Sequence, residues 1–174
     1  MHMAFLGFDK RMGVIAVLSV LGIVCMSYLL SLHFEGASSS AFCNFGAGFS
    51  CQIVNQSLYA EVAGVPVAAL GLVYFAGVIG LVALRDRVPY SMRLLFLGTL
   101  GLLVFSLYLS VVELTVLRSI CLFCEGSKVL MLAIAALAYG EARRRGHSFA
   151  WFEVLAVLAA GGTLVYAVRT LQGT

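Results

Sequence analysis

The sequence predicts an all-α integral membrane protein with five membrane-spanning helices and a short amphipathic helix in the first outer loop. Of its 174 residues, 62% are hydrophobic and only 11% are charged. The mean hydropathy is +1.05, and the apolar residues fall in long uninterrupted runs. A soluble domain of this size could not bury so much apolar surface, so lipid is the expected solvent.

Five segments are long enough to cross about 30 Å of hydrocarbon as a helix, which takes about 20 residues. They are residues 12–32, 65–84, 94–112, 122–139 and 149–168. No proline interrupts them, because Pro66 falls in the first turn of the second segment, where a missing N–H is tolerated. We therefore expect residues 1–174 to form a single membrane domain with one long outer loop, residues 33–64.

The first segment has an alternative interpretation as a cleaved signal peptide. Basic residues precede it, and the small residues "GASSSA" follow it. Its apolar run is longer than that of a normal signal peptide, so we expect it to be a membrane span.

The basic residues predict the orientation of the chain. Eight of the eleven lysines and arginines fall on one side of the predicted spans: Lys10, Arg11, Arg85, Arg87, Arg93, Arg143, Arg144 and Arg145. The positive-inside rule assigns that side to the cytoplasm, with the N-terminus inside and the C-terminus outside. We interpret the small net charge of +3 as this orientation signal, and we expect no binding to nucleic acid.

Four of the five cysteines form two close pairs on the predicted outer side. Cys43 and Cys51 lie in the long loop, and Cys121 and Cys124 form the motif "CLFC" where the fourth span begins. In bacteria the outer side is oxidising, so we expect a location in the bacterial inner (plasma) membrane with the cysteines facing the periplasm. Cys25 lies in the middle of the first span and is expected to be an inert thiol.

The long loop carries a helical pattern of apolar residues. Val54, Leu58 and Val62, together with Tyr59, follow helical spacing. We expect a short amphipathic helix there that lies on the membrane surface and caps the bundle.

The C-x-x-C pair lies where water gives way to lipid. At Cys121, the free N–H groups and the dipole of the helix would stabilise a thiolate. Cys124 would lie on the same face, about one turn deeper. Such a pair can exchange disulfides with a water-borne partner and pass electrons to a lipid-soluble two-electron acceptor, for which a quinone is suitable. The glycines between Cys43 and Cys51 allow that loop to act as a thiol shuttle.

Two other interpretations of the four cysteines remain open at this stage. They could form a tetrahedral zinc site in a protein without enzymatic activity, or two structural disulfides. We expect no metal, because one ligand would lie a turn inside the bilayer.

Several residues close to Cys124 are candidates for contact with a quinone. The aromatic candidates are Phe123, Tyr74, Phe105 and Tyr108, which are otherwise packing residues. Lys128 could hydrogen-bond a quinone carbonyl, extend outward to the membrane surface, or pair with Glu125.

Taken in order, these motifs resemble the vitamin K epoxide reductase family. They are the Cys43-x7-Cys51 pair, Ser57 six residues later, "GVPVAALG" at residues 64–71, and "CLFC" at the fourth helix. The resemblance covers about residues 12–139.

The resemblance implies a catalytic four-helix bundle around a quinone, with a fifth helix as in bacterial members. Cys43 would meet a thioredoxin-like protein, and Cys51 would exchange disulfides with Cys121. Cys124 would contact the quinone, and Ser57 would assist the exchange. The implied activity is that of a quinone-dependent thiol oxidoreductase that generates disulfides and reduces ubiquinone or menaquinone.

Two features of this sequence depart from the family pattern. Many bacterial members carry a fused thioredoxin-like domain, whereas this sequence ends at Thr174, so we expect a separate periplasmic thioredoxin-fold partner. Lys128 stands where vertebrate members have a tyrosine, which leaves reduction of a vitamin K epoxide by a dithiol as an alternative activity. Membrane proteins of the disulfide bond formation protein B type share the chemistry, but they have four spans and an earlier C-x-x-C motif.

Overall fold

The computed structural model describes residues 10–35, 43, 46 and 48–172, with only the backbone at 171 and 172. Its long helices are α1 (Lys10–Glu35), α3 (Val67–Ala83), α4 (Ser91–Val112), α5 (Leu122–Arg144) and α6 (Trp151–Gln172). The predicted all-α membrane architecture is therefore confirmed.

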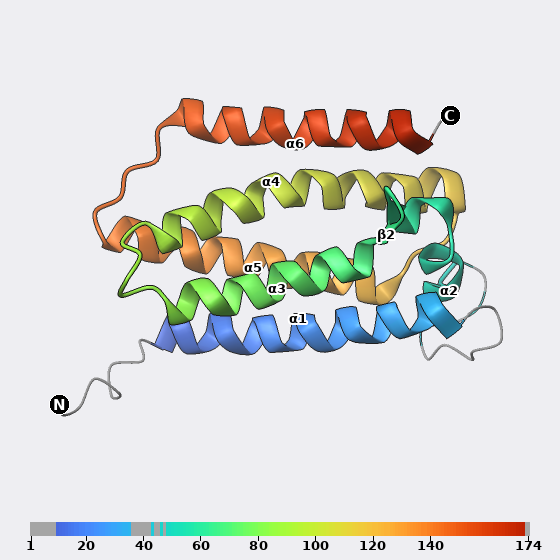
Figure 1. Cartoon of the computed structure of the whole chain (residues 1–174), viewed down its shortest axis with the longest axis horizontal. Helices are drawn as coiled ribbons and strands as arrows, with labels where there is room; N and C mark the ends of the chain where they lie inside the picture. The colour runs from blue at the N-terminus through green and yellow to red at the C-terminus, as the bar shows by residue number, and fades with distance from the viewer. Residues whose placement is uncertain (1–9, 36–42, 44–45, 47, 173–174) are drawn as a thin grey trace.

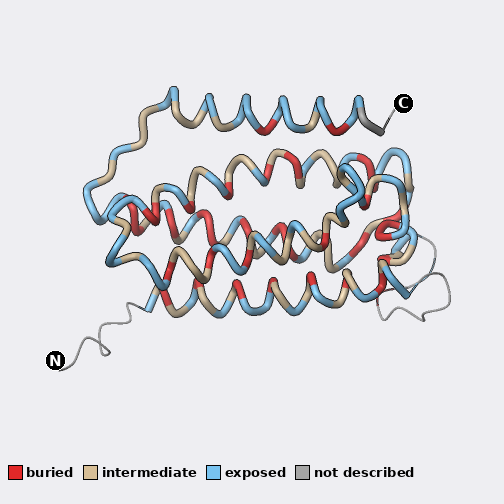
Figure 2. Tube along the Cα trace, in the orientation of Figure 1, coloured by how far each residue is buried: buried red, intermediate tan, exposed pale blue. Residues whose placement is uncertain are grey.

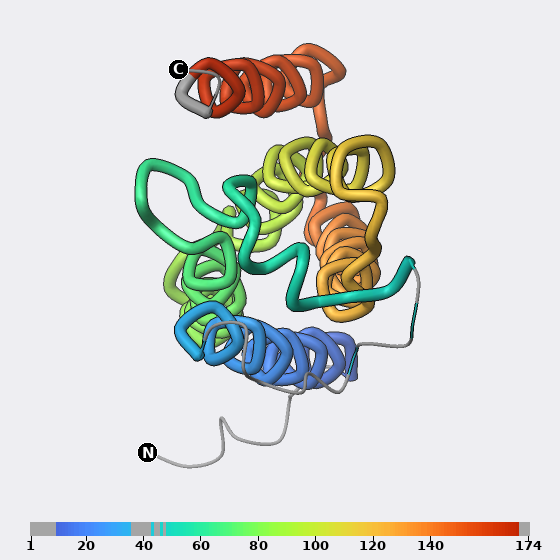
Figure 3. Tube along the Cα trace, turned by 90° about the vertical axis from the view of Figure 1, so that its right-hand side faces the viewer, coloured from blue at the N-terminus to red at the C-terminus, as the bar shows by residue number. Residues whose placement is uncertain are grey.

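Helices α1, α3, α4 and α5 form a bundle, and α6 lies outside it against α4 (Figures 1 and 3). Buried residues line the inward faces of the four bundle helices, whereas most of α6 is exposed (Figure 2). The described chain therefore has a four-helix core with a peripheral fifth helix.

Four helices in the described part of the chain are long and apolar enough to cross a membrane: Lys10–Glu35, Ser91–Leu117, Leu122–Arg144 and Trp151–Thr170. The remaining predicted span, the second in the chain (65–84), corresponds to α3, which has 17 residues and a length of about 26 Å. This helix begins after the predicted start at residue 65, because Val65–Pro66 pairs as a strand instead.

Glycines allow the helices to approach closely at two crossings. A Cβ added at Gly22 of α1 would collide with the ring of Phe75, which is fully buried on α3. A Cβ at Gly161 of α6 would lie 2.8 Å from the carbonyl oxygen of Gly101 on α4. Small residues at such crossings are typical of helix pairs in lipid, where close van der Waals packing provides the attraction.

The two ends of the bundle differ in charge and chemistry. The basic clusters lie at the start of α1 and in the α3–α4 and α5–α6 connections, which share one end of the molecule (Figure 1). At that end, Arg93 of α4 forms an ion pair with Glu153 of α6. The cysteine motifs lie at the opposite end, as expected for alternating spans. The assignment of the two ends to the inside and outside of a cell stays a prediction.

The helix in the long loop is shorter than the sequence predicted. Helix α2 (Cys51–Asn55) is followed by a 3₁₀ turn, η2 (Leu58–Ala60), and by strands β1 (Glu61–Val62) and β2 (Val65–Pro66). The expectation of a helix continuing through Val62 is therefore wrong.

Local hydrogen bonds and turn geometry explain this difference. Ser57 Oγ donates to the carbonyl oxygen of Val54 at 2.7 Å, where the helical path ends. Ala63 and Gly64 both have positive φ values, 52° and 77°, as a two-residue hairpin turn requires. The result is a folded loop that crosses the end of the bundle (Figure 3).

Candidate active site

The C-x-x-C pair lies at the N-terminus of α5, as predicted. Cys121 is the N-cap residue and is fully buried. Its Sγ accepts the N–H of Cys124 at 3.3 Å. The N-terminal end of α5, with its free backbone N–H groups, therefore faces the sulfur of Cys121.

Backbone hydrogen bonds bring the loop pair of cysteines next to the C-x-x-C pair. The N–H of Ser50 donates to the carbonyl oxygen of Ile120 at 3.1 Å, and the N–H of Ile120 donates to Gly48 at 2.9 Å. Ser50 and Ile120 immediately precede Cys51 and Cys121 in the chain. Two motifs about 70 residues apart in sequence are thus held in adjacent segments.

The four cysteines do not lie together as four free thiolates around one point. Cys43 and Cys51 form a disulfide with a Cα–Cα distance of 5.8 Å, whereas Cys121 and Cys124 are free thiols. Among the described residues, no group of three His, Cys, Asp or Glu side chains is placed to hold a metal ion. The arrangement is that of one disulfide beside one dithiol.

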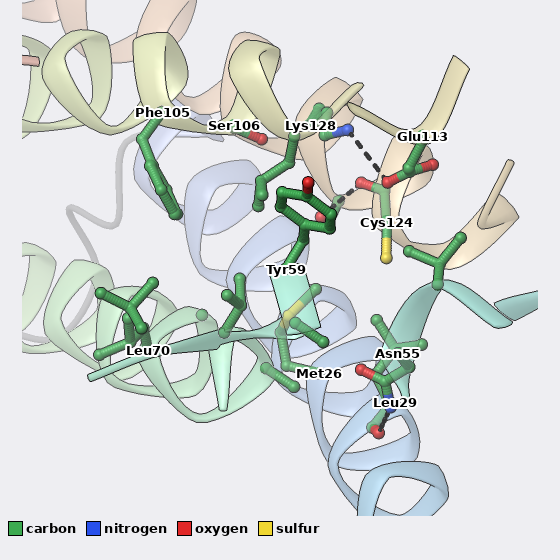
Figure 4. Close-up of a pocket in the computed structure, with 18 of the residues that line it drawn as sticks. Met26, Leu29, Asn55, Tyr59, Leu70, Phe105, Ser106, Glu113, Cys124 and Lys128 are labelled. Carbon is green, nitrogen blue, oxygen red and sulfur yellow. Dashed lines mark hydrogen bonds and ion pairs between the residues drawn. The ribbon is translucent and has the colours of Figure 1, made fainter. Parts of the chain in front are cut away.

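A cavity of about 200 Å³ lies inside the bundle directly beneath the loop (Figure 4). All four bundle helices line it, the loop forms its roof, and Leu164 and Val168 of α6 contribute from the side. Most of the lining is apolar, and Cys124 opens onto it. A single water molecule needs a cavity of only about 10–15 Å³, so this space is large enough for an organic molecule.

Helical periodicity decides which predicted side chains reach this cavity from α5. Cys124, Ser127, Lys128 and Met131 form one stripe along α5 and line the cavity. Phe123 is outside the lining and packs against Tyr28 of α1 with ring centroids 5.0 Å apart. The structure therefore does not place Phe123 where we expected it.

The same argument applies to the aromatic candidates on α3 and α4. Phe105 lies on the lining stripe of α4, and Tyr74 lines the cavity from α3 while its hydroxyl contacts Thr99 Oγ1 at 2.9 Å. Tyr108 is turned away from this stripe and packs against Phe105, with centroids 6.3 Å apart. Tyr108 is not among the residues that line this cavity, and its contact with a quinone stays a prediction.

Lys128 is buried and held by polar partners. Its Nζ donates to Glu125 Oε1 and to Ser110 Oγ, both at 2.5 Å, and lies 3.8 Å from Glu113 Oε1. Of the three predicted alternatives, pairing with Glu125 is confirmed, and extension to the membrane surface is wrong because only 7% of the side chain is exposed. Lys128 also lines the cavity, so it remains available to a ligand there.

Glu113 is a site residue that the sequence analysis missed. It is 3% exposed, and its Oε2 accepts the backbone N–H of Cys121 at 2.9 Å. It begins a π-helical turn, η3 (Glu113–Leu117), which extends α4 beyond the predicted end of the third span at residue 112. The available signal was its position within the apolar run "LSVVELTVL", since an acidic residue in such a run is a candidate functional group.

The loop residues that line the cavity include Ser57, Asn55 and Tyr59. The described hydrogen bond of the Ser57 hydroxyl is to Val54, so its predicted role in the disulfide exchange stays a prediction. Asn55 is buried and donates its side-chain N–H to the carbonyl oxygen of Leu29 on α1. Tyr59 projects into the cavity (Figure 4), and both residues were missed because the loop fold was not predictable from spacing.

The helices and motifs described above match those of a known protein family. The sequence model of the vitamin K epoxide reductase family matches residues 13–139. The matched region runs from α1 into α5 and contains both cysteine pairs, Glu113 and Lys128. Because the match spans most of the chain, this protein belongs to the vitamin K epoxide reductase family.

Proposed function

We propose that this membrane oxidoreductase is a quinone-dependent thiol oxidoreductase that generates disulfides. Its reductant would be a thioredoxin-fold protein of the periplasm, and its electron acceptor would be ubiquinone or menaquinone. The observation that carries the proposal is the position of Cys124, which belongs to a dithiol beside a second cysteine pair and opens onto an apolar cavity.

The cavity lining fits a quinone. Its walls are mostly apolar, as a lipid-soluble ring requires, and Lys128 offers an N–H donor to a carbonyl oxygen. When bound there, a quinone would supply a two-electron acceptor that takes up two protons.

The cysteines would then carry the electrons in steps that balance. A thiolate of the partner attacks Cys43, and a mixed disulfide forms as the Cys43–Cys51 bond breaks. The second partner thiol resolves it, which leaves a loop dithiol and an oxidised partner. Cys51 next attacks Cys121 of an oxidised Cys121–Cys124 pair, and Cys124 leaves as a thiolate. Cys43 then attacks Cys51 and releases Cys121, so that the loop disulfide re-forms and Cys121 and Cys124 become a dithiol.

In the last step the Cys121–Cys124 disulfide forms, and two electrons and two protons pass to the quinone. The described state, with a Cys43–Cys51 disulfide and free Cys121 and Cys124, corresponds to the stage before this transfer. The orientation inferred from the basic residues would place Cys43 on the periplasmic side of the membrane.

The decisive experiment is quinone reduction by the purified protein in detergent. A reduced thioredoxin-fold donor supplies electrons, and the loss of quinone absorbance is followed for short-chain ubiquinone and menaquinone. We expect turnover by the native chain and none by Cys124→Ala. Cys25→Ala serves as the matched control, because Cys25 does not line the cavity.

Two results would contradict the proposal. Failure of the native chain to reduce either quinone with several donors would remove its basis. Turnover that persists in Cys124→Ala would exclude the proposed route. A parallel assay with a quinone epoxide separates this activity from epoxide reduction.

A further inference from the structure

Three polar side chains, Ser110, Glu125 and Lys128, connect the cavity to a separate recess. We propose that this set, called here the relay, carries one of the two protons used in quinone reduction. The inference rests on the proposed function, since it assigns the proton path of that reaction.

The contacts within the relay form a closed triangle. Lys128 Nζ donates to Ser110 Oγ and to Glu125 Oε1 at 2.5 Å each, and Ser110 Oγ donates to Glu125 Oε1 at 2.8 Å. A proton can therefore move between Lys128 and Glu125 without rearrangement of the helices, because the donor and acceptor already lie within hydrogen-bond distance.

The relay spans two spaces of different exposure. Lys128 lines the main cavity together with Cys124, whereas Glu125 and Ser110 line a second recess of about 220 Å³. The Lys128 side chain is 7% exposed and that of Glu125 is 38% exposed. Glu125, in the first turn of α5, is therefore the relay member open to the surroundings of the protein, while Lys128 faces the cavity.

Glu113 is a buried carboxyl group that lies beside this relay. It lines both spaces, and its side chain is 3% exposed. One carboxylate oxygen accepts the N–H of Cys121 at 2.9 Å, and the other lies 3.8 Å from Lys128 Nζ. Lys128 Nζ therefore has two carboxyl neighbours, of which Glu125, at 2.5 Å, makes the closer contact needed for transfer.

The proton balance assigns a step to each group. Oxidation of Cys121 and Cys124 to a disulfide breaks two S–H bonds, and the quinone gains two electrons and two protons as two O–H bonds form. The ammonium group of Lys128 donates one of these protons to the nearer carbonyl oxygen. Glu125 then takes up a proton from water in the recess and passes it to the amine. One thiol supplies the second proton of the quinone, and the proton of the other thiol is released to water.

The test compares Glu125→Gln with the native chain. The amide keeps the size and the hydrogen bonds of the side chain but cannot carry a proton, so we expect kcat for quinone reduction to fall on the order of 10²-fold. The equilibrium Kd for the quinone, measured by dialysis, should remain unchanged. The single-turnover rate of thiol exchange with the donor should also remain unchanged. Neither quinone binding nor thiol exchange uses the relay.

Chemical rescue separates proton transfer from a structural role. In Glu125→Ala, formate or acetate can enter the recess and replace the missing carboxyl, so we expect kcat to rise with the concentration of the acid. Glu141→Gln is the matched control: Glu141 is a buried glutamate on α5, paired with Arg145 at 3.0 Å and far from the cavity. Its kcat should match the native value.

The outcomes distinguish this inference from the proposed function. If the native chain reduces no quinone, the proposed function itself fails. If the native chain is active and Glu125→Gln retains native kcat, the relay is wrong. A loss of kcat without rescue of Glu125→Ala, or with a weakened quinone Kd, would also overturn the relay and leave Glu125 with a structural role.

Discussion

Glu113 is expected to stabilise the active-site end of the bundle through its hydrogen bond to Cys121. Its carboxylate is almost fully buried and accepts the N–H of Cys121 at 2.9 Å. Replacement by alanine leaves that buried N–H without an acceptor at the start of α5. Replacement by glutamine keeps an acceptor oxygen and removes only the charge, so the two variants separate the hydrogen bond from the ion pair.

The size of the effect follows from the contacts. Removal of a hydrogen bond to a charged group costs about 1.5–3 kcal/mol. At 3.8 Å the attraction between Glu113 and Lys128 is about 4 kcal/mol in an effective dielectric of about 20. The desolvation of the carboxylate, several kcal/mol, offsets that attraction, and Lys128 keeps its contact with Glu125. We therefore expect a loss of about 1.5–3 kcal/mol for Glu113→Ala and about 1 kcal/mol for Glu113→Gln.

The free energy of unfolding is measured by titration with SDS in mixed micelles, followed by far-ultraviolet circular dichroism. A second measurement is the rate at which a maleimide labels Cys121, which should rise in Glu113→Ala because the start of α5 opens more often. Asp86→Ala is the control, since Asp86 is 81% exposed and surface changes of this kind stay within about 0.5 kcal/mol.

Two outcomes would refute this reasoning. Native stability and native labelling of Cys121 in Glu113→Ala would mean that the hydrogen bond contributes nothing measurable. An equal loss in the alanine and glutamine variants would assign the stabilisation to the charge of Glu113 instead of to its acceptor oxygen.

Two further predictions concern packing around the cavity. Gly161→Leu should separate α6 from α4 and destabilise the protein by about 1–3 kcal/mol, because its Cβ would lie 2.8 Å from the carbonyl oxygen of Gly101. Gly162→Leu is its control, as a Cβ there meets no atom within 4 Å; equal SDS titrations of the two variants would contradict the prediction. Asn55→Ala should cost about 1 kcal/mol and accelerate hydrogen exchange in α2, because the bond to Leu29 is lost. Unchanged exchange would show that the loop is held by other contacts.

The number, order and approximate position of the membrane helices could be predicted from the sequence. Runs of about 20 apolar residues require a lipid environment. Basic residues flank these runs at one end and the cysteine motifs lie at the other end. The exact ends were less predictable: α5 continues to Arg144, five residues past the predicted end at 139. A helix does not end where its apolar residues end, because its backbone hydrogen bonds continue into polar segments.

The inward face of each helix could not be predicted. In a soluble helix the apolar stripe marks the buried face, but a membrane helix is apolar on all sides because lipid replaces water. Phe123 is as hydrophobic as Phe105, and Tyr108 is aromatic as well, yet of these three only Phe105 lines the cavity. Sequence distance from Cys124 therefore selected the correct region of the bundle but could not tell which of its aromatic side chains line the cavity.

The sequence by itself determined that this is a helical membrane protein with a dithiol motif at the end of a span, because composition and C-x-x-C spacing are local properties. Only the tertiary structure decided that Cys51 and Cys121 lie in hydrogen-bonded segments and that Glu113 contacts both Cys121 and Lys128. Those contacts depend on how each helix is rotated about its axis, and close packing between helices at residues such as Gly22 and Gly161 fixes that rotation.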